Sequence, residues 1–123
     1  MPRFIVLHHQ FPPGHQRATH WDLLLERGEV LRSWALESPP QVGRTTAATD
    51  LADHRRLYLD YEGPISGDRG SVTQWAAGTY ELLSETADEW AIRLEGPQLA
   101  GTARLVRDAF DAQRWVFSLS ADD

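Results

Sequence analysis

The feature that most constrains the fold is an alternation of apolar and polar residues with a period of two, interrupted at short intervals by Gly, Pro and Asp. This alternation is typical of antiparallel β-strands with one buried face, and it predicts few helices. So many short strands in 123 residues favour a mainly β fold, either a small antiparallel barrel, closed or partly open, or a two-sheet sandwich. We expect about eight strands, at residues 4–7, 21–25, 30–36, 71–75, 79–83, 89–94, 102–107 and 115–119.

Two longer segments, residues 8–19 and 38–54, lack this pattern. Loops of about 12 residues or more are uncommon in compact domains and are often functional. The second segment contains the Ala-rich stretch 45–52, and within this segment we expect one short helix. With 41% hydrophobic residues, a chain of this length is expected to form a single domain over residues 1–123.

Composition excludes several kinds of chemistry. The chain has no cysteine, so thiol catalysis, disulfides and zinc–thiolate sites are excluded, and a metal would need histidine, carboxylate and water as ligands. The net charge of -6 argues against general, non-specific nucleic-acid binding, which depends on many phosphate contacts. All 12 basic residues are arginine, whose planar guanidinium suits carboxylate or phosphate, so a local basic site remains open.

No apolar run approaches the roughly 20 residues that a membrane-spanning helix needs. The first residues lead into a strand-like segment with no signal-peptide pattern. We therefore expect a cytoplasmic protein without membrane contact.

Histidines cluster near the start of the chain, at His8, His9, His15 and His20. In a strand that includes residues 20–25, alternation places His20 and Asp22 on the same face. This pair can hold a divalent cation, and His9 at the end of the first strand would complete a set of two histidines and one carboxylate. Because adjacent strand residues point to opposite faces, His8 is not expected to share that site, and His15 is expected in an exposed loop.

His54 and Tyr58 form a second candidate pair. A spacing of four residues would place both on one face of a helical turn. With the arginines that follow His54, an imidazole and a phenol could stabilise the charge of a phosphate.

Two other interpretations stay open. His20 and Asp22 can equally form a solvated surface pair, with Asp22 bound to an arginine. His20, Asp22 and a distal His54 could also be the three ligands of a non-haem iron oxygenase. Oxygenases that use 2-oxoglutarate usually carry a basic residue about ten positions after the distal histidine, and Pro64 stands there in this chain.

Several segments together carry a family signal, because their order and spacing agree along most of the chain. These are residues 4–9, 20–26, 28–36, 53–54 with Tyr58, 61–65, 70–72 with Trp75, Gly78 and Tyr80, and the closing segments 94–101, 105–107 and Trp115. They resemble the 3'-phosphoesterase domain of bacterial ATP-dependent DNA ligase D and its small stand-alone relatives.

The resemblance implies a small β-barrel that removes a 3'-phosphate or a terminal ribonucleotide from nucleic-acid ends in DNA repair. It implies a divalent cation, with manganese as the first expectation and zinc or another metal as alternatives. By this resemblance His9, His20 and Asp22 fall on metal-ligand positions, and His54 and Tyr58 face the scissile phosphate. The expected partners are a DNA or RNA/DNA 3' end and ligase or end-joining repair proteins, with the chain itself a monomer.

The chain also departs from the family pattern. Leu24 stands where the family carries an arginine that contacts phosphate, Leu7 stands where a glutamine is usual, and the loop 10–19 is longer. Loss of the arginine leaves a non-catalytic module that binds nucleic-acid ends or repair partners as the alternative function. The candidates to replace its guanidinium are Arg17, Arg44, Arg55, Arg56 and Arg69.

Overall fold

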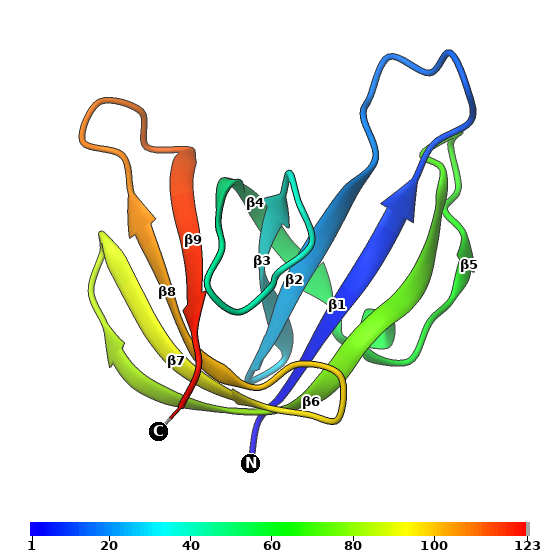
Figure 1. Ribbon diagram of the computed structural model, residues 1–123. Helices are drawn as coiled ribbons and strands as arrows, with labels where there is room; N and C mark the ends of the chain where they lie inside the picture. Colours follow the sequence, from blue (N-terminus) through cyan, green and yellow to red (C-terminus); the bar gives the residue numbers. More distant parts are fainter. Residues whose placement is uncertain (123) are drawn as a thin grey trace.

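The computed structural model describes residues 1–122, which form nine strands and one short 3-10 helix, η1. Eight strands close a barrel in the order β1-β2-β3-β4-β9-β8-β7-β6, and β6 pairs with β1 to complete it (Figure 1). The ninth strand, β5, pairs only with β6. Element bounds are β1 Arg3–Gln10, β2 His20–Arg27, β3 Val30–Leu36, β4 Thr45–Arg55, η1 Arg56–Leu59, β5 Gly63–Pro64, β6 Ser71–Glu85, β7 Glu89–Glu95, β8 Gly101–Arg107 and β9 Arg114–Ser120.

The expected mainly β barrel is confirmed, with 59% of residues in strands and 3% in helix. The one short helix among the described residues is η1, at Arg56–Leu59, directly after the segment 38–54 in which it was expected. The Ala-rich stretch 45–52 lies in β4 and pairs with both β3 and β9. Pairing on both sides outweighs the weak helical preference of its alanines. None of the described residues form a helix long and apolar enough to cross a membrane.

The two strands expected at 71–75 and 79–83 are one continuous strand, β6, of 15 residues. Its first half pairs with β1 and its second half with β7, so it forms part of two neighbouring strand pairs. A register shift opposite Val6 and Leu7 lets it bend without ending. Gly78 lies within this strand, where a turn was expected. A Cβ at this position would lie 2.1 Å from the Glu95 carbonyl oxygen of β7, so the absence of a side chain lets the two strands approach closely.

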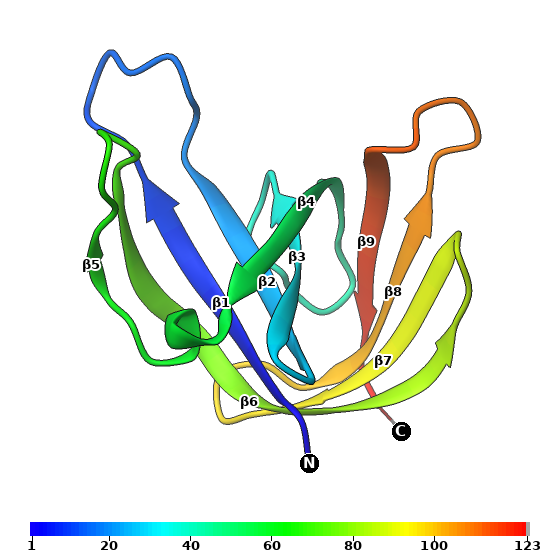
Figure 2. The same cartoon turned by 180° about the vertical axis from the view of Figure 1, so that it is seen from behind.

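Two apolar clusters occupy the two faces of β1 and β2. The first is the large barrel core, to which Phe4, Val6, Leu23 and Leu25 contribute. The second lies on the outer face and consists of Ile5, Leu7, Leu24, Leu31, Leu59 and Val72. We call it the outer cluster. The chain between β4 and β6 crosses outside the barrel and packs against this cluster, as Figure 2 shows from behind.

Candidate metal centre

Three side chains meet at the upper end of the β1–β2 pair. His9 and His20 are directly opposite each other in register, and Asp22 lies two residues further along β2. Asp22 Oδ2 is 3.1 Å from His9 Nδ1, and Asp22 Oδ1 is 2.9 Å from His20 Nε2. One ligand atom from each of the three residues lies within 4.8 Å of the others. His8 is on the opposite face, where its ring stacks on Trp21.

Main-chain carbonyls fix the orientation of both imidazoles. His9 Nε2 donates to the Arg69 carbonyl at 2.6 Å, and His20 Nδ1 donates to the Ala18 carbonyl at 3.2 Å. In the neutral rings, His9 Nδ1 and His20 Nε2 then carry lone pairs that face the Asp22 carboxylate. A hydrogen bond from the second ring nitrogen to a carbonyl is the usual support of a histidine that binds metal.

The donor set fits a divalent cation. Asp22 is 3% exposed, and its Oδ1 has no aligned hydrogen-bond partner among residues 1–122 although His20 Nε2 lies close by. A buried carboxylate whose two oxygens each face an imidazole nitrogen needs positive charge beside it, which a bound cation would supply. Two histidines and one carboxylate suit manganese, iron or zinc.

Protonation in the cluster is shifted by these contacts. Burial by itself would raise the pKa of Asp22, but hydrogen bonds and charge from His20 and His9, when their rings are protonated, outweigh it and lower the pKa to about 2. For His20, burial would lower the pKa, but the contact with Asp22 outweighs burial and raises it. Asp22 is therefore ionised at neutral pH, as a ligand must be.

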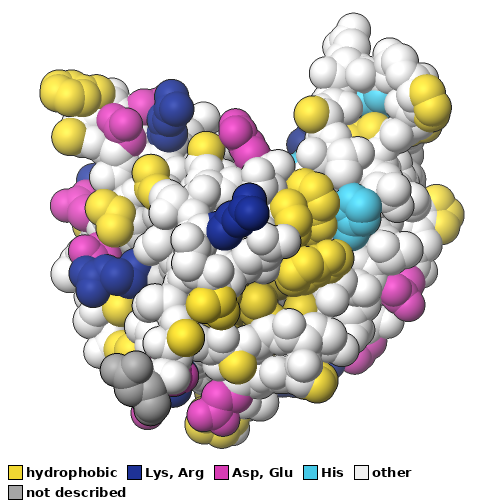
Figure 3. All heavy atoms as spheres, viewed as in Figure 1, with side chains coloured by type: hydrophobic (Ala, Val, Ile, Leu, Met, Phe, Trp, Pro, Cys, Tyr) yellow, Lys and Arg dark blue, Asp and Glu magenta, His cyan; other side chains and the backbone are white. Residues whose placement is uncertain are grey.

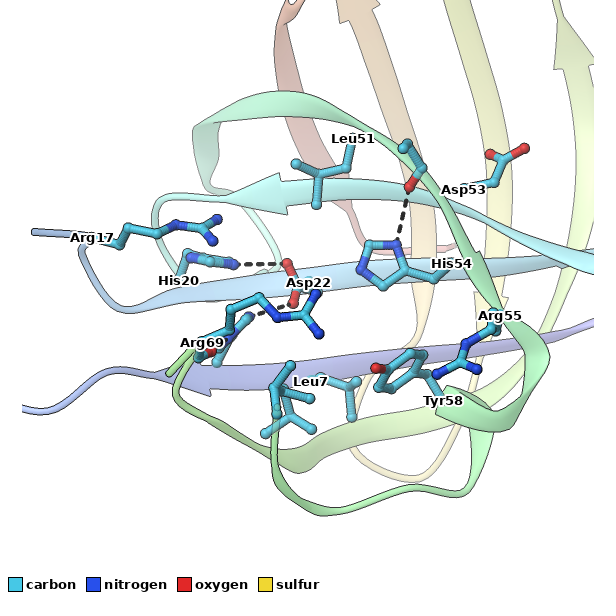
Figure 4. Close-up of a pocket in the computed structure, with 14 residues that line it drawn as sticks. Leu7, Arg17, His20, Asp22, Leu51, Asp53, His54, Arg55, Tyr58 and Arg69 are labelled. Atoms are coloured by element: carbon cyan, nitrogen blue, oxygen red, sulfur yellow. Dashed lines mark hydrogen bonds and ion pairs between the residues drawn. The ribbon is translucent and has the colours of Figure 1, made fainter. Parts of the chain in front are cut away.

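A pocket of about 380 Å³ opens beside the cluster. Its lining includes the three cluster residues together with His54 and Tyr58. In Figure 4, His20 and Asp22 lie on one side and His54 and Tyr58 on the other. The two residues of the second pair do not share a helical turn as expected, because His54 lies in β4 and Tyr58 in η1. Their rings still meet edge to face, with centroids 5.7 Å apart.

The position of His54 follows from strand register. His54 is paired with Leu31, a residue of the outer cluster, so it also faces outward. Its Nδ1 donates to the Ala52 carbonyl at 3.1 Å, and Figure 4 shows the ring directed toward Asp22. His54 Nε2 is thereby left free for chemistry in the pocket.

Most arginines are engaged elsewhere. On the face seen in Figure 3, acidic and basic side chains of the described residues are interspersed rather than gathered by sign. Among residues 1–122, seven arginines form ion pairs with carboxylates, namely Arg3, Arg27, Arg32, Arg56, Arg93, Arg104 and Arg107.

Three arginines give the pocket its positive charge. Arg17, Arg55 and Arg69 line it, and none has a carboxylate partner within the described chain. The structure does not bring Arg44 to the site, because Arg44 lines a separate pocket with Phe117. Arg56 is bound to Glu26 at 2.6 Å. The candidates therefore narrow from five arginines to three.

Leu24 and Leu7 lie under the site in the outer cluster, with exposures of 0% and 1%. The two apolar departures from the family pattern are thus neighbours in one packed layer. The alternation of β2 places Leu24 on the same face as His20 and Asp22, but it does not predict that this face is buried. This face is buried because residues 56–65 pack on it. That packing is a tertiary contact, so no local pattern in the sequence signals it.

The geometry also decides between the open interpretations. The solvated surface pair is wrong, because Asp22 is buried and contacts two histidines rather than an arginine. For an oxygenase-type set, His20 and Asp22 would require His54 as the third ligand, but within residues 1–122 the cluster contains His9 in that place.

Fold and site together define the class of protein: a small β-barrel whose outer wall carries a candidate metal centre of two histidines and one carboxylate beside a basic pocket. Comparison with known proteins gives the family. A family model described as the DNA ligase D 3'-phosphoesterase domain matches residues 13–107, and the chain belongs to this family. This confirms the resemblance found in the sequence. The match includes His20, Asp22, His54 and Tyr58 and begins after His9.

Curated relatives agree with this assignment. The multifunctional non-homologous end joining protein LigD of Mycobacterium bovis is 34% identical over 92% of this chain. The multifunctional non-homologous end joining DNA repair protein LigD of Mycobacterium tuberculosis shows the same identity and coverage. LigD of Pseudomonas aeruginosa is 29% identical over 72% of the chain. The chain spans 15% of the length of the two mycobacterial relatives.

Proposed function

We propose that this protein is a divalent-metal-dependent phosphoesterase that removes a 3'-phosphate or a terminal ribonucleotide from nucleic-acid ends in DNA repair. The observation that carries the proposal is the partly buried cluster of His9, His20 and Asp22, which opens to a pocket with three arginines that have no carboxylate partner within the described chain. Anions are attracted to such a pocket even though the whole chain has a net charge of -6. Family membership supports the same substrate class.

The cation would be held by His9, His20 and Asp22, and we propose manganese, with zinc as the alternative. When bound, it supplies a Lewis acid that polarises a phosphate oxygen. The pocket arginines neutralise the charge of the phosphate. His54 holds a proton or a lone pair at Nε2, because Nδ1 is committed to the Ala52 carbonyl, and it can therefore exchange a proton with the leaving or attacking oxygen.

Tyr58 is positioned by apolar packing. Its ring lies against Tyr61 and the outer cluster, which leaves the hydroxyl directed into the pocket in the view of Figure 4. There it can donate a hydrogen bond as charge develops on a phosphate oxygen. His54 and Tyr58 thus act from the side of the pocket opposite the metal ligands.

One observation favours a second function. The place of the family arginine is filled by Leu24, which is enclosed in the outer cluster. Loss of one contact to the transition state typically costs about 3 kcal/mol, or a hundredfold or more in rate. A non-catalytic module that binds nucleic-acid 3' ends, or repair partners such as a ligase, would use the same pocket and would not require this transition-state contact.

The test is Mn²⁺-dependent release of phosphate from a DNA primer with a 3'-phosphate, together with removal of a single 3'-ribonucleotide. We expect turnover by the natural protein and none by Asp22→Ala, which loses Mn²⁺. Asp53→Ala is the matched control for metal affinity, because Asp53 lines the same pocket outside the cluster. Tight binding of the primer end without turnover would refute catalysis and support the binding module.

A further inference from the structure

Arg69 differs from the other pocket arginines in how its side chain is held. Its Nε donates to the Ser66 carbonyl at 2.6 Å, and its Nη2 donates to the Ser66 hydroxyl at 3.1 Å. A guanidinium has five N–H groups, so two are used and three remain. No acceptor within residues 1–122 binds those three. Arg69 therefore presents a fixed and unsatisfied donor edge.

Arg17 and Arg55 lack such support. The guanidinium of Arg17 rests over the ring of Phe11, 5.1 Å from its centroid, a contact that leaves its donors free to turn. Arg55 has no side-chain hydrogen bond or ion pair within the described chain. Ordering a free arginine on a ligand costs side-chain entropy, and a side chain that is already fixed avoids most of this cost.

The same residue is tied to the metal cluster. The carbonyl of Arg69 accepts the hydrogen bond from His9 Nε2, so its backbone is fixed relative to a metal ligand. Figure 4 shows the Arg69 side chain reaching from there into the pocket on the side of Asp22. Position 69 is therefore rigidly placed with respect to any phosphate that approaches the cluster.

The turn around Arg69 needs glycine to reach this place. Asp68 and Gly70 both have positive φ, +56° and +76°. A Cβ at Gly70 would lie 2.1 Å from the Gln10 carbonyl oxygen at the end of β1. The close approach presses the 66–70 turn against the strand that carries His9, and it fixes where Arg69 sits.

We propose that Arg69 is the residue that holds the phosphate in this pocket, with Ser66 as its positioning residue. The ligand is a phosphate monoester or inorganic phosphate, bound by the free fork of the guanidinium. This inference rests on the proposed function. In the family, an arginine at the position of Leu24 contacts phosphate. The inference assigns that contact to Arg69, which reaches the pocket from its side.

The experiment titrates inorganic phosphate into the full chain freed of metal with EDTA, and follows arginine side-chain NH signals by NMR. Metal-free protein separates the arginine contact from any contact between phosphate and metal. We expect Arg69→Gln to weaken phosphate binding about 10- to 100-fold, the value of hydrogen bonds to a charged group. Arg69→Lys keeps the charge but loses the fork, so its phosphate affinity should lie between that of the natural protein and that of Arg69→Gln. Mn²⁺ affinity should stay unchanged in both variants.

Arg44→Gln is the matched control, because it removes the same charge from an arginine outside the pocket. Its phosphate affinity should remain within about twofold of the natural value, as expected for a distant screened charge. Ser66→Ala should weaken binding about 2- to 5-fold by freeing the guanidinium, and Ser66→Thr should restore it. Rescue by threonine identifies Ser66 as a positioning residue, since its hydroxyl acts only through Arg69.

The inference is overturned if Arg69→Gln loses no more phosphate affinity than Arg44→Gln, or if Arg17→Gln or Arg55→Gln loses more than Arg69→Gln. Turnover of the 3'-phosphorylated primer is measured in parallel with Mn²⁺. Loss of phosphate binding in Arg69→Gln, with no turnover by the natural protein, would contradict the proposed catalysis and leave the assignment of Arg69 standing. Turnover by the natural protein, with phosphate affinity unchanged in Arg69→Gln, would support the proposed catalysis and contradict the assignment of Arg69.

Discussion

Replacing Leu24 with arginine would restore the family residue at a position that this chain has made apolar. Leu24 is 0% exposed and packs in the outer cluster with Ile5 and Leu31. Two carboxylates flank it along the outward face of β2, Asp22 and Glu26, and both already have partners. A new guanidinium would have to compete for one of these partners or remain buried without one.

The magnitude follows from burial. Truncation of a buried leucine to alanine typically costs about 2–5 kcal/mol, because the contacts are lost and a cavity remains. Leu24→Arg keeps part of these contacts through its methylene groups but buries a charge, and an unpaired buried charge costs about 3–5 kcal/mol. Pairing with Asp22 or Glu26 would recover part of this. We expect a net loss of about 2–4 kcal/mol, a large fraction of the roughly 5–15 kcal/mol that stabilises a domain.

The assay is urea denaturation followed by tryptophan fluorescence, with Leu24→Ala as the cavity reference. Leu82→Arg is the matched control, because Leu82 is 44% exposed in β6 and its substitution should change stability by about 0.5 kcal/mol or less. Both Leu24 variants should lower the denaturation midpoint while Leu82→Arg leaves it in place. An unchanged midpoint in Leu24→Arg would refute the conclusion that residues 56–65 enclose this position.

Three further predictions concern the site. Gly70→Ala should destabilise the fold by more than the roughly 1–3 kcal/mol of backbone strain alone, whereas Gly14→Ala, with nothing within 4 Å of its Cβ, should cost only that strain, as thermal denaturation would show. Because the pKa of Asp22 falls from 3.8 to about 2 on folding, its ionised form stabilises the metal-free fold by about 2 kcal/mol above pH 3.8, and this contribution is lost as the pH falls to 2. Urea midpoints of the natural protein and Asp22→Asn should therefore converge over that pH range; a constant difference would contradict the shift. His54→Gln and Tyr58→Phe should lower kcat about 100-fold or more while Mn²⁺ affinity, measured by calorimetry, stays the same.

Alternation in the sequence was sufficient to predict most of the strands and the faces of β1 and β2. It placed His20 and Asp22 together and separated His8 from His9, because strand side chains point to alternate faces whatever the strand pairs with. It failed where pairing partners matter. Residues 45–52 have a composition that suits a helix, yet β3 and β9 hold them as a strand on both sides.

The site divides in the same way. The sequence by itself determined the donor types, the absence of thiol ligands and the face on which His20 and Asp22 lie, since these follow from residue identity and from a period of two. Only the tertiary structure decided that His9 lies opposite His20, that the floor under the site is apolar, and that Arg69 rather than Arg44 reaches the pocket. Register, loop packing and the positive φ of Gly70 are set by contacts between distant segments, which a local pattern does not encode.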